Sequence, residues 1–187
     1  MTRCDWCKGD PIYETYHDEE WGVPVKDDQR LFEFLTLETF QAGLSWITVL
    51  KKREHFRMAF DQFNFEKVAK YGPSKILELE NNVGIIRNKL KIKAAVGNAQ
   101  AFIKIREELG SFSDYIWAFV NHQPIQNKFS KLSDLPANTP LSDAISSDLK
   151  TRGFKFVGST VICAHMQATG MVNDHLQTCF RFRELSS

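Results

Sequence analysis

Cysteine and histidine side chains gather at the two ends of this 187-residue sequence. Cys4, Cys7 and His17 lie near its beginning, and His175 and Cys179 lie near its end. Thiolate sulfur and imidazole nitrogen are the ligands that tetrahedral Zn²⁺ prefers. His175 and Cys179 are separated by the i, i+4 spacing that places two side chains on one face of a helix. The pattern predicts a structural zinc site that joins the start of the chain to its end, because four protein ligands leave no open position for chemistry.

The spacing leaves the fourth ligand of this site open. Cys4-Asp-Trp-Cys7 is a C-x2-C pair, so one possible set is Cys4, Cys7, His175 and Cys179. The rival set replaces Cys7 with His17. A third interpretation contains no metal, because free cysteines are often simply buried. A disulfide is not expected, since nothing in the sequence marks a secreted protein.

A carboxylate interrupts an apolar stripe in a helix that we expect around residues 30–52. Glu38 falls on this stripe, whose apolar members at helical spacing are Leu31, Phe34, Leu35, Ala42, Trp46 and Val49. The opposite side is also apolar, so the helix is expected to be central. A buried charge is expensive unless it is compensated. Glu38 is therefore either a member of an ion pair or an acceptor that lines a ligand pocket.

Five aromatic side chains lie close to this carboxylate in the sequence: Trp6, Tyr13, Tyr16, Trp21 and Trp46. Most aromatic residues pack in protein cores. Residues 1–28, however, show no regular helical period, so several of these rings are expected to line a cavity. Electron-rich ring faces beside a carboxylate would suit a flat cationic ligand.

Residues 142–170 are typical of two short helices joined by a tight turn. Ser142 is expected to cap the first helix and Gly153 to end it in a left-handed conformation. Ser159 or Thr160 is expected to cap the second helix. Amide groups at the start of that helix could bind an anion, with basic side chains around them from Lys150, Arg152 and Lys155.

A second group of basic residues consists of Arg87, Lys89, Lys91 and Lys93. Side chains spaced two apart cannot share one helical face. We therefore expect an ordinary solvated surface there.

The elements that must position these residues are helical almost throughout. Apolar residues recur at three-to-four spacing and β-branched alternation is scarce, so the predicted fold class is all-α. With 43% hydrophobic and 25% charged residues, the composition indicates a single globular domain over residues 1–187. The net charge of +1 means that any contact with nucleic acid would depend on local basic clusters. No secretory signal or membrane-spanning run is recognisable, so we expect a cytoplasmic monomer without a membrane partner.

Eight segments carry a resemblance to a known family: Arg3-Cys4, Tyr16-His17-Asp18, Glu20-Trp21-Gly22-Val23-Pro24, Gln41-Ala-Gly-Leu-Ser-Trp46, Lys51-Lys52-Arg53-Glu54, Phe119-Val-Asn-His-Gln-Pro124, Gly153-Phe-Lys-Phe-Val-Gly158 and Asn173-Asp174-His175. The chain resembles the 3-methyladenine DNA glycosylase I family over essentially its full length. The resemblance implies a helix-hairpin-helix DNA glycosylase fold, with the hairpin at about 142–170. It implies zinc ligands at Cys4, His17, His175 and Cys179, in preference to Cys7. It also implies a damaged-base pocket with Glu38 as the catalytic residue and with base-binding residues Trp6, Tyr13, Tyr16, Trp21 and Trp46.

The activity implied by the resemblance is hydrolysis of the N-glycosidic bond of 3-methyladenine in alkylated double-stranded DNA. Free 3-methyladenine and an abasic site would be the products. The DNA backbone would lie against the hairpin at Gly153, Lys155, Gly158 and Thr160. Superfamily relatives such as endonuclease III carry a lysine nucleophile where this chain has Thr160, so no lyase step is expected. Those relatives also carry a catalytic aspartate, for which Asp174 is the nearest match. Asp174 adjoins a zinc ligand, and we expect the chemistry to depend on Glu38 instead.

Two other classes of function remain compatible with the residues. A non-catalytic reader of damaged DNA, with a structural zinc, would use the same aromatic cage without releasing a base. An interaction protein would use the zinc site as a scaffold and would have no salt-dependent affinity for DNA.

Overall fold

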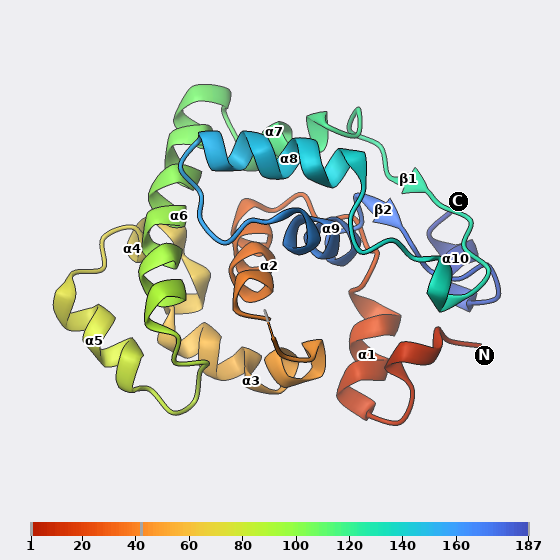
Figure 1. Ribbon diagram of the computed structural model, residues 1–187, viewed down its shortest axis with the longest axis horizontal. Helices are drawn as coiled ribbons and strands as arrows, with labels where there is room; N and C mark the ends of the chain where they lie inside the picture. Colours follow the sequence, from red (N-terminus) through yellow and green to blue (C-terminus); the bar gives the residue numbers. More distant parts are fainter. Residues whose placement is uncertain (1, 42, 187) are drawn as a thin grey trace.

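The computed structural model describes residues 2–41 and 43–186 and is mostly helical (Figure 1). The mostly helical architecture agrees with the prediction from the apolar spacing. The α-helices are α1 (Pro11–Glu19), α2 (Asp28–Gln41), α3 (Trp46–Ala59), α4 (Phe65–Val68), α5 (Pro73–Asn81), α6 (Lys89–Leu109), α7 (Phe112–Ala118), α8 (Pro140–Thr151), α9 (Ser159–Ala168) and α10 (Phe180–Glu184). Short 3-10 helices are η1 (Asp5–Cys7), η2 (Asp61–Phe63) and η3 (Leu132–Asp134), and the strands are β1 (Ile125–Gln126) and β2 (Val172–Asn173).

Helix α2 is enclosed by its neighbours. Every residue from 31 to 40 is buried, and the helix packs against α3, α6, α7 and α9. A polar side chain buried on it is therefore costly unless it finds a partner inside the protein. Glu33 does so through Arg53 and Arg57. The hydroxyl of Thr39 donates to the Thr36 carbonyl.

The single helix expected over residues 30–52 is wrong, because the chain turns between α2 and α3. Helix α2 ends at Gln41, and α3 begins at Trp46 after Ser45 in extended backbone. Gly43 has a φ of +81°, which an L side chain rarely adopts. Ala42, which was expected on the apolar stripe, lies outside the described residues. The turn puts Glu38 and Trp46 on separate elements.

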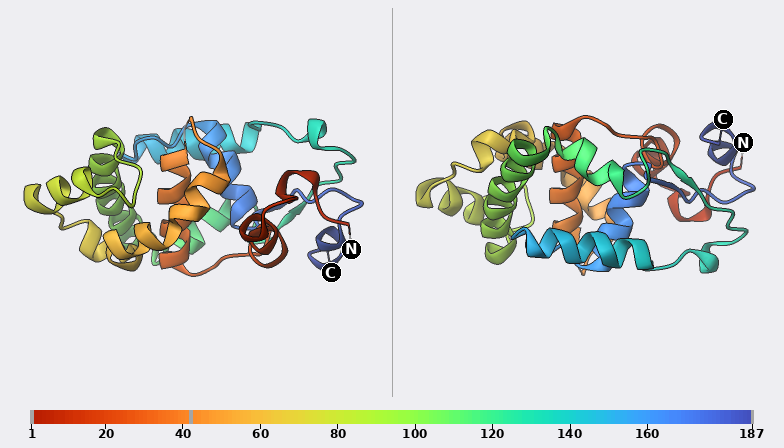
Figure 2. Two further views of the ribbon diagram at one scale, coloured as in Figure 1. Left: turned by 90° about the horizontal axis from the view of Figure 1, so that it is seen from below. Right: turned by 90° about the horizontal axis from the view of Figure 1, so that it is seen from above.

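Residues 1–28 contain more regular structure than the sequence suggested. They include η1 and α1, and α1 begins where the Asp10 side chain accepts a hydrogen bond from the Ile12 amide. The expectation of an irregular segment was wrong because α1 is short and buries only Tyr16 and His17. The first and last segments of the chain lie side by side in both views of Figure 2. There the Phe180 amide donates to the Thr2 carbonyl at 3.0 Å.

The hairpin region consists of two helices, α8 and α9, which pack against each other. The prediction that Ser142 caps the first helix was wrong. Thr139 is the cap, and Ser142 completes a reciprocal capping box with it. Gly153 has a φ of +95°, as predicted. Gly158 precedes α9, so Ser159 and Thr160 lie inside its first turn.

Two short strands tie the middle of the chain to its C-terminal part. Strands β1 and β2 pair in parallel, with Ile125 opposite Val172 and Gln126 opposite Asn173. Among the described helices, none has both the length and the apolar character needed to cross a bilayer.

Candidate functional site

A cavity of about 220 Å³ is lined by residues from the N-terminal segment, α2, α3, η3 and α9. Its lining residues are Trp6, Tyr13, Tyr16, Trp21, Glu38, Gln41, Trp46, Leu132, Leu135, Ala164 and Gln167. Glu38 and all five aromatic residues singled out in the sequence thus border one space. The cavity combines an acidic group with a largely aromatic wall.

Glu38 is the acidic group of this cavity. Its side chain is 4% exposed, and among the described residues its Oε2 atom has no hydrogen-bond partner. Burial raises the pKa of Glu38 to about 8, because the charged form loses its hydration. The sequence left open whether Glu38 forms an ion pair or lines a ligand pocket. Among the described residues, Glu38 forms no ion pair. The carboxyl group is available to a ligand.

The aromatic residues pack on one another around the cavity. The Trp6 ring meets Tyr13 and Trp21 edge-on, with ring centroids 4.8 and 5.0 Å apart. Tyr16 lies 5.7 Å from Trp46. Tyr16, Trp21 and Trp46 are buried, whereas Trp6 and Tyr13 are partly exposed. Such mutual packing fixes the rings, so a planar cation could bind against faces that are already in place.

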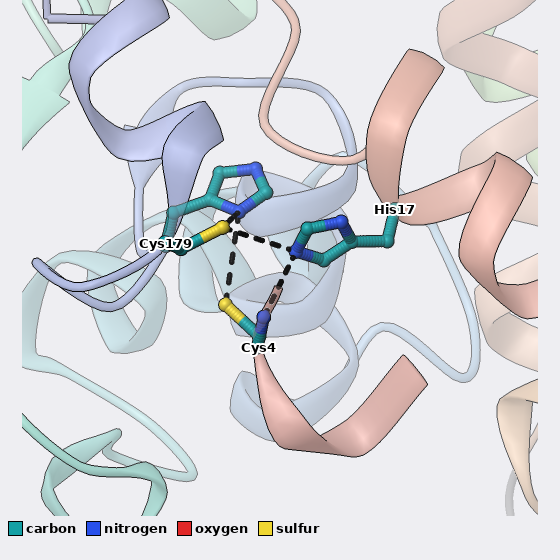
Figure 3. A group of neighbouring side chains, drawn as sticks. Cys4, His17 and Cys179 are labelled. Atoms are coloured by element: carbon teal, nitrogen blue, oxygen red, sulfur yellow. Dashed lines mark hydrogen bonds between the residues drawn. The ribbon is translucent and has the colours of Figure 1, made fainter. Parts of the chain in front are cut away.

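Cys4, His17, His175 and Cys179 form a second buried cluster, whose potential ligand atoms all lie within 4.8 Å of one another. The Cys179 Sγ is 3.4 Å from His17 Nε2 and 3.5 Å from His175 Nδ1 (Figure 3). Cys4 Sγ is 3.8 Å from His175 Nδ1. Tetrahedral zinc with ordinary bond lengths separates sulfur from nitrogen by about 3.6 Å. The donor set and its spacing therefore fit a tetrahedral metal ion.

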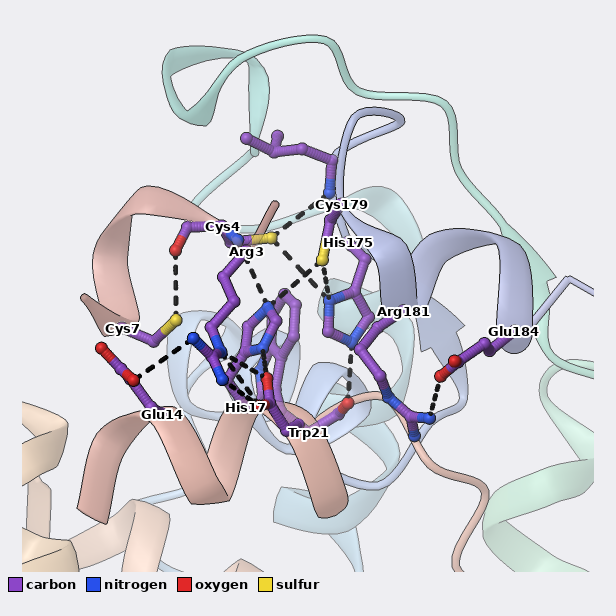
Figure 4. Close-up of polar contacts among 12 residues, drawn as sticks. Arg3, Cys4, Cys7, Glu14, His17, Trp21, His175, Cys179, Arg181 and Glu184 are labelled. Carbon is purple, nitrogen blue, oxygen red and sulfur yellow. Dashed lines mark hydrogen bonds and ion pairs between the residues drawn. The ribbon is translucent and has the colours of Figure 1, made fainter. Parts of the chain in front are cut away.

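Both histidines in the cluster are oriented by a second hydrogen bond. His17 Nδ1 lies 2.8 Å from the Asp18 carboxylate, and His175 Nε2 lies 2.9 Å from the Trp21 carbonyl (Figure 4). Partners of this kind hold metal-ligating imidazoles in the correct tautomer and orientation. Between the two sulfurs, a hydrogen bond raises the pKa of Cys4 and lowers that of Cys179. A cation bound among the four side chains would take the place of the thiol protons, because thiols ligate metals as thiolates.

Cys7 is not a member of the cluster. Its Sγ donates to the Cys4 carbonyl at 3.1 Å, and Figure 4 shows it directed away from the other three cluster side chains. The structure groups His17, and not Cys7, with the other three residues. The expected helix for His175 and Cys179 was wrong, because the chain is irregular there and α10 begins only after Cys179.

The cysteine–histidine cluster and the aromatic cavity share a wall. Trp21 lines the cavity, its carbonyl accepts from His175, and its ring lies 4.6 Å from the His175 ring. Trp6 also lines the cavity and lies 5.3 Å from the His17 ring. Any displacement of these two histidines would therefore move the aromatic wall.

The hairpin residues lie apart from the cavity. Gly153, Lys155 and Thr160 are exposed, and Gly158 is partly exposed. No side chain caps the start of α9 among the described residues, so amides of its first turn are open to a ligand. Arg152 is less available than the sequence suggested, because it pairs with Glu108 and Asp148.

Several cavity residues were missed by the sequence analysis. Gln41 lies three residues after Glu38, a spacing that could have identified it. Leu132 and Leu135 come from a stretch expected to be only a loop, and Ala164 and Gln167 come from α9, which is far away in sequence. No local signal connects these four positions to Glu38.

Two further polar residues support the cavity without lining it. Asp174 is buried and accepts hydrogen bonds from Asn127 and from Gln167, at 2.7 and 2.8 Å. The solvated surface expected at the second basic group is wrong for Lys91, which is 6% exposed. Its Nζ donates to the Phe40 carbonyl at 3.3 Å, near the C-terminal end of α2. Lys91 thus holds the helix that carries Glu38.

Comparisons with known proteins give a consistent result. The methyladenine glycosylase family model matches residues 6–182. DNA-3-methyladenine glycosylase 1 of Escherichia coli is 50% identical over 179 residues, covering 96% of each chain. A crystal structure of 3-methyladenine DNA glycosylase I superposes with a TM-score of 0.93 at 49% identity, covering 96% of this chain and 98% of the other. The Staphylococcus aureus enzyme, solved for the structural basis of 3-methyladenine recognition, has a TM-score of 0.93 at 38% identity and 96% coverage of both chains.

Proposed function

Since this chain belongs to the methyladenine glycosylase family, we infer that it is a DNA-3-methyladenine glycosylase, a DNA repair enzyme. Its substrate is duplex DNA that contains alkylated adenine, and it releases free 3-methyladenine. The observation that assigns this activity to a site is the buried Glu38 carboxyl group in the aromatic cavity, whose Oε2 atom has no partner in the part of the chain that the structure describes.

We propose that this cavity holds the damaged base after it has been extruded from the duplex. Adenine alkylated at N3 is cationic in DNA, so the surrounding rings attract it through their faces. Trp6, Tyr13, Tyr16, Trp21 and Trp46 are the proposed base-binding residues. Glu38, once ionised, accepts hydrogen bonds from the amino edge of the base and compensates its positive charge.

The proposed reaction depends on a base that is already a good leaving group. The bond between the sugar C1′ and the base nitrogen breaks, and the departing base takes the electron pair, which neutralises its charge. Water adds to C1′ and loses a proton to solvent. Thr160 stands where a nucleophilic lysine would be needed for strand cleavage, so we propose a monofunctional enzyme that leaves an abasic site.

We further propose that Cys4, His17, His175 and Cys179 hold a structural Zn²⁺ ion. The ion would supply no chemistry to the reaction, because four protein ligands fill its coordination. It would fix the wall formed by Trp6 and Trp21. Thiolate ligands of this kind suit the reducing cytoplasm in which we place the protein, as a monomer.

The region of α8 and α9 is proposed as a helix-hairpin-helix element that binds the DNA backbone. Gly153, Lys155, Gly158 and Thr160 would contact phosphates without reading the sequence. The open amides at the start of α9 support this proposal, because helix N-termini bind anions.

One assay tests the enzyme assignment and the role of Glu38 together. The protein is incubated with methylated duplex DNA, and liberated 3-methyladenine is measured by chromatography. We expect the parent and the exposed control variant Glu107→Gln to release the base at similar rates. Glu38→Gln should release it at least about a hundredfold more slowly. Tight binding of methylated duplex without any released base would instead identify a non-catalytic damage-binding module. Full activity of Glu38→Gln would refute the proposed role of that carboxylate.

A further inference from the structure

The turn between α8 and α9 contains a strained residue. Phe156 has a φ of +58° and is 42% exposed. The left-handed region is unfavourable for a bulky L-residue, and such residues persist only where surrounding structure enforces them. Phe156 lies within the segment 153–160 proposed to contact DNA. What enforces its conformation is therefore relevant to function.

The residue before Phe156 is clamped from helix α6. Asn98 is 3% exposed, and its amide group forms two hydrogen bonds with the backbone of Lys155. Its Nδ2 donates to the Lys155 carbonyl at 3.0 Å, and its Oδ1 accepts from the Lys155 amide at 2.8 Å. A paired contact of this kind fixes both the position and the orientation of the peptide groups on either side of Lys155.

The residues after Phe156 are held from helix α8. The Ser146 hydroxyl, which is also buried, donates to the Val157 carbonyl at 2.6 Å. The Ser142 hydroxyl lies 2.8 Å from the hydroxyl of Ser159. Alternate residues of the turn are thus attached to the protein interior. Phe156, Gly158 and Thr160, which lie between them, are at least partly exposed.

We propose that Asn98 is a positioning residue for DNA binding, and that Ser146 assists it. By fixing Lys155, Asn98 holds Phe156 in the left-handed conformation and thereby sets the direction of the amide groups that follow it. The proposal rests on the proposed function, because it assumes that these amides contact the DNA backbone. It assigns Asn98 no contact with DNA or with the base.

The test combines Asn98→Ala with Phe156→Gly, because glycine at position 156 should not need the hydrogen bonds from Asn98 to adopt a positive φ. Asn98→Ala should weaken binding to a duplex with a stable abasic-site analogue about tenfold, because the turn can then relax to ordinary backbone angles. Binding of free 3-methyladenine, followed by tryptophan fluorescence, should stay within about twofold of the parent, since the cavity is untouched. Glycine adopts positive φ freely, so Asn98→Ala/Phe156→Gly should bind duplex within about threefold of Phe156→Gly alone.

Controls separate this proposal from the proposed function and from misfolding. Asn81→Ala, whose amide bonds the Leu77 carbonyl of its own helix, should bind duplex like the parent. Ser146→Ala, a small change that keeps the packing, should weaken duplex binding in the same direction as Asn98→Ala. A parent that neither binds DNA nor releases base would refute the proposed function. A functional parent whose Asn98→Ala variant binds duplex normally, or whose double variant shows no recovery, would refute the role of Asn98.

Discussion

Glu38 combines two properties that rarely occur together, namely burial and a carboxylate oxygen, Oε2, that has no hydrogen-bond partner among the described residues. Because its pKa is raised to about 8 by burial, the free enzyme carries mostly a neutral carboxyl group at pH 7. A cationic base that enters the cavity favours the ionised form and lowers this pKa again. Substrate binding and loss of the Glu38 proton are therefore coupled.

This coupling predicts the pH dependence of the reaction. We expect kcat/KM to rise with pH, to reach half of its maximum near pH 8 and to level off above that pH, because kcat/KM reports ionisation of the free enzyme. The corresponding rise in kcat should occur at lower pH, since the bound cation stabilises the carboxylate. Base release from methylated duplex, measured from pH 5.5 to 9, checks the pH profiles of both kcat/KM and kcat. A kcat/KM that does not change between pH 6 and 8 would contradict the assignment.

The same group predicts how stability changes with pH. The unfolded chain loses the Glu38 proton near the ordinary pKa of 4.5, whereas the folded protein keeps it to about pH 8. The folded state binds more protons over this interval, so stability falls as pH rises through it, by on the order of 5 kcal/mol in total. Glu38→Gln should remove this slope and be more stable than the parent at pH 8. Urea unfolding at pH 5 and pH 8 provides the comparison, and equal slopes in the two proteins would contradict it.

At the residue scale, the sequence identified the candidate residues of the cavity better than the residues that hold them in place. Glu38 could be found because a carboxylate on an apolar stripe is unusual, and the five rings because they lie near it in sequence. Gln167 and Lys91 could not be found in this way. Their roles depend on contacts with Asp174 and with the Phe40 carbonyl, which only the folded chain creates.

At the scale of elements, the close approach of α9 to the N-terminal segment decides where Trp21 lies. Gly170, just after α9, has a φ of +69°, and a Cβ atom there would lie 2.5 Å from the backbone of Val23 and Pro24. Gly22 donates from its amide to the Gln167 carbonyl at 3.0 Å, which keeps this approach tight. A side chain at position 170 would therefore push the segment that carries Trp21 away from α9.

Gly170→Ala should therefore destabilise the protein by about 3 kcal/mol and weaken binding of free 3-methyladenine. Gly97→Ala is a matched control within α6, because a Cβ atom there meets nothing within 4 Å. The control should be neutral or more stable by up to about 1 kcal/mol. Urea unfolding and tryptophan fluorescence measure the two effects. Similar behaviour of the two variants would show that the contact is not tight.

Element boundaries were predicted less well than element types. The break between α2 and α3 was missed, because apolar spacing continues across it from Phe40 to Trp46. Helix α1 was missed because two of its inward residues, Tyr16 and His17, serve the cavity and the cysteine–histidine cluster and leave little apolar periodicity. The hairpin was recognised from its glycines, which mark turns independently of packing.

At the scale of the whole molecule, the cysteine–histidine cluster connects residues near the two ends of the chain. His17→Ala should abolish binding of the proposed zinc ion, whereas Cys7→Ser should still bind one equivalent, because only His17 is grouped with the other three residues. Loss of this link between the two segments should lower the free energy of unfolding by about 4 kcal/mol, the order expected for a long-range cross-link. Metal analysis by mass spectrometry and thermal unfolding measure the two quantities. Retention of zinc by His17→Ala would overturn the ligand set.

The pairing of first and last segments also has a consequence for synthesis. Cys4 and His17 lie 171 and 162 residues before the side chains they meet, His175 and Cys179. The aromatic wall that Trp6 and Trp21 form beside them therefore cannot be completed until that later segment has been translated. A truncated chain that lacks His175 and Cys179 should therefore have an incomplete cavity and release no 3-methyladenine.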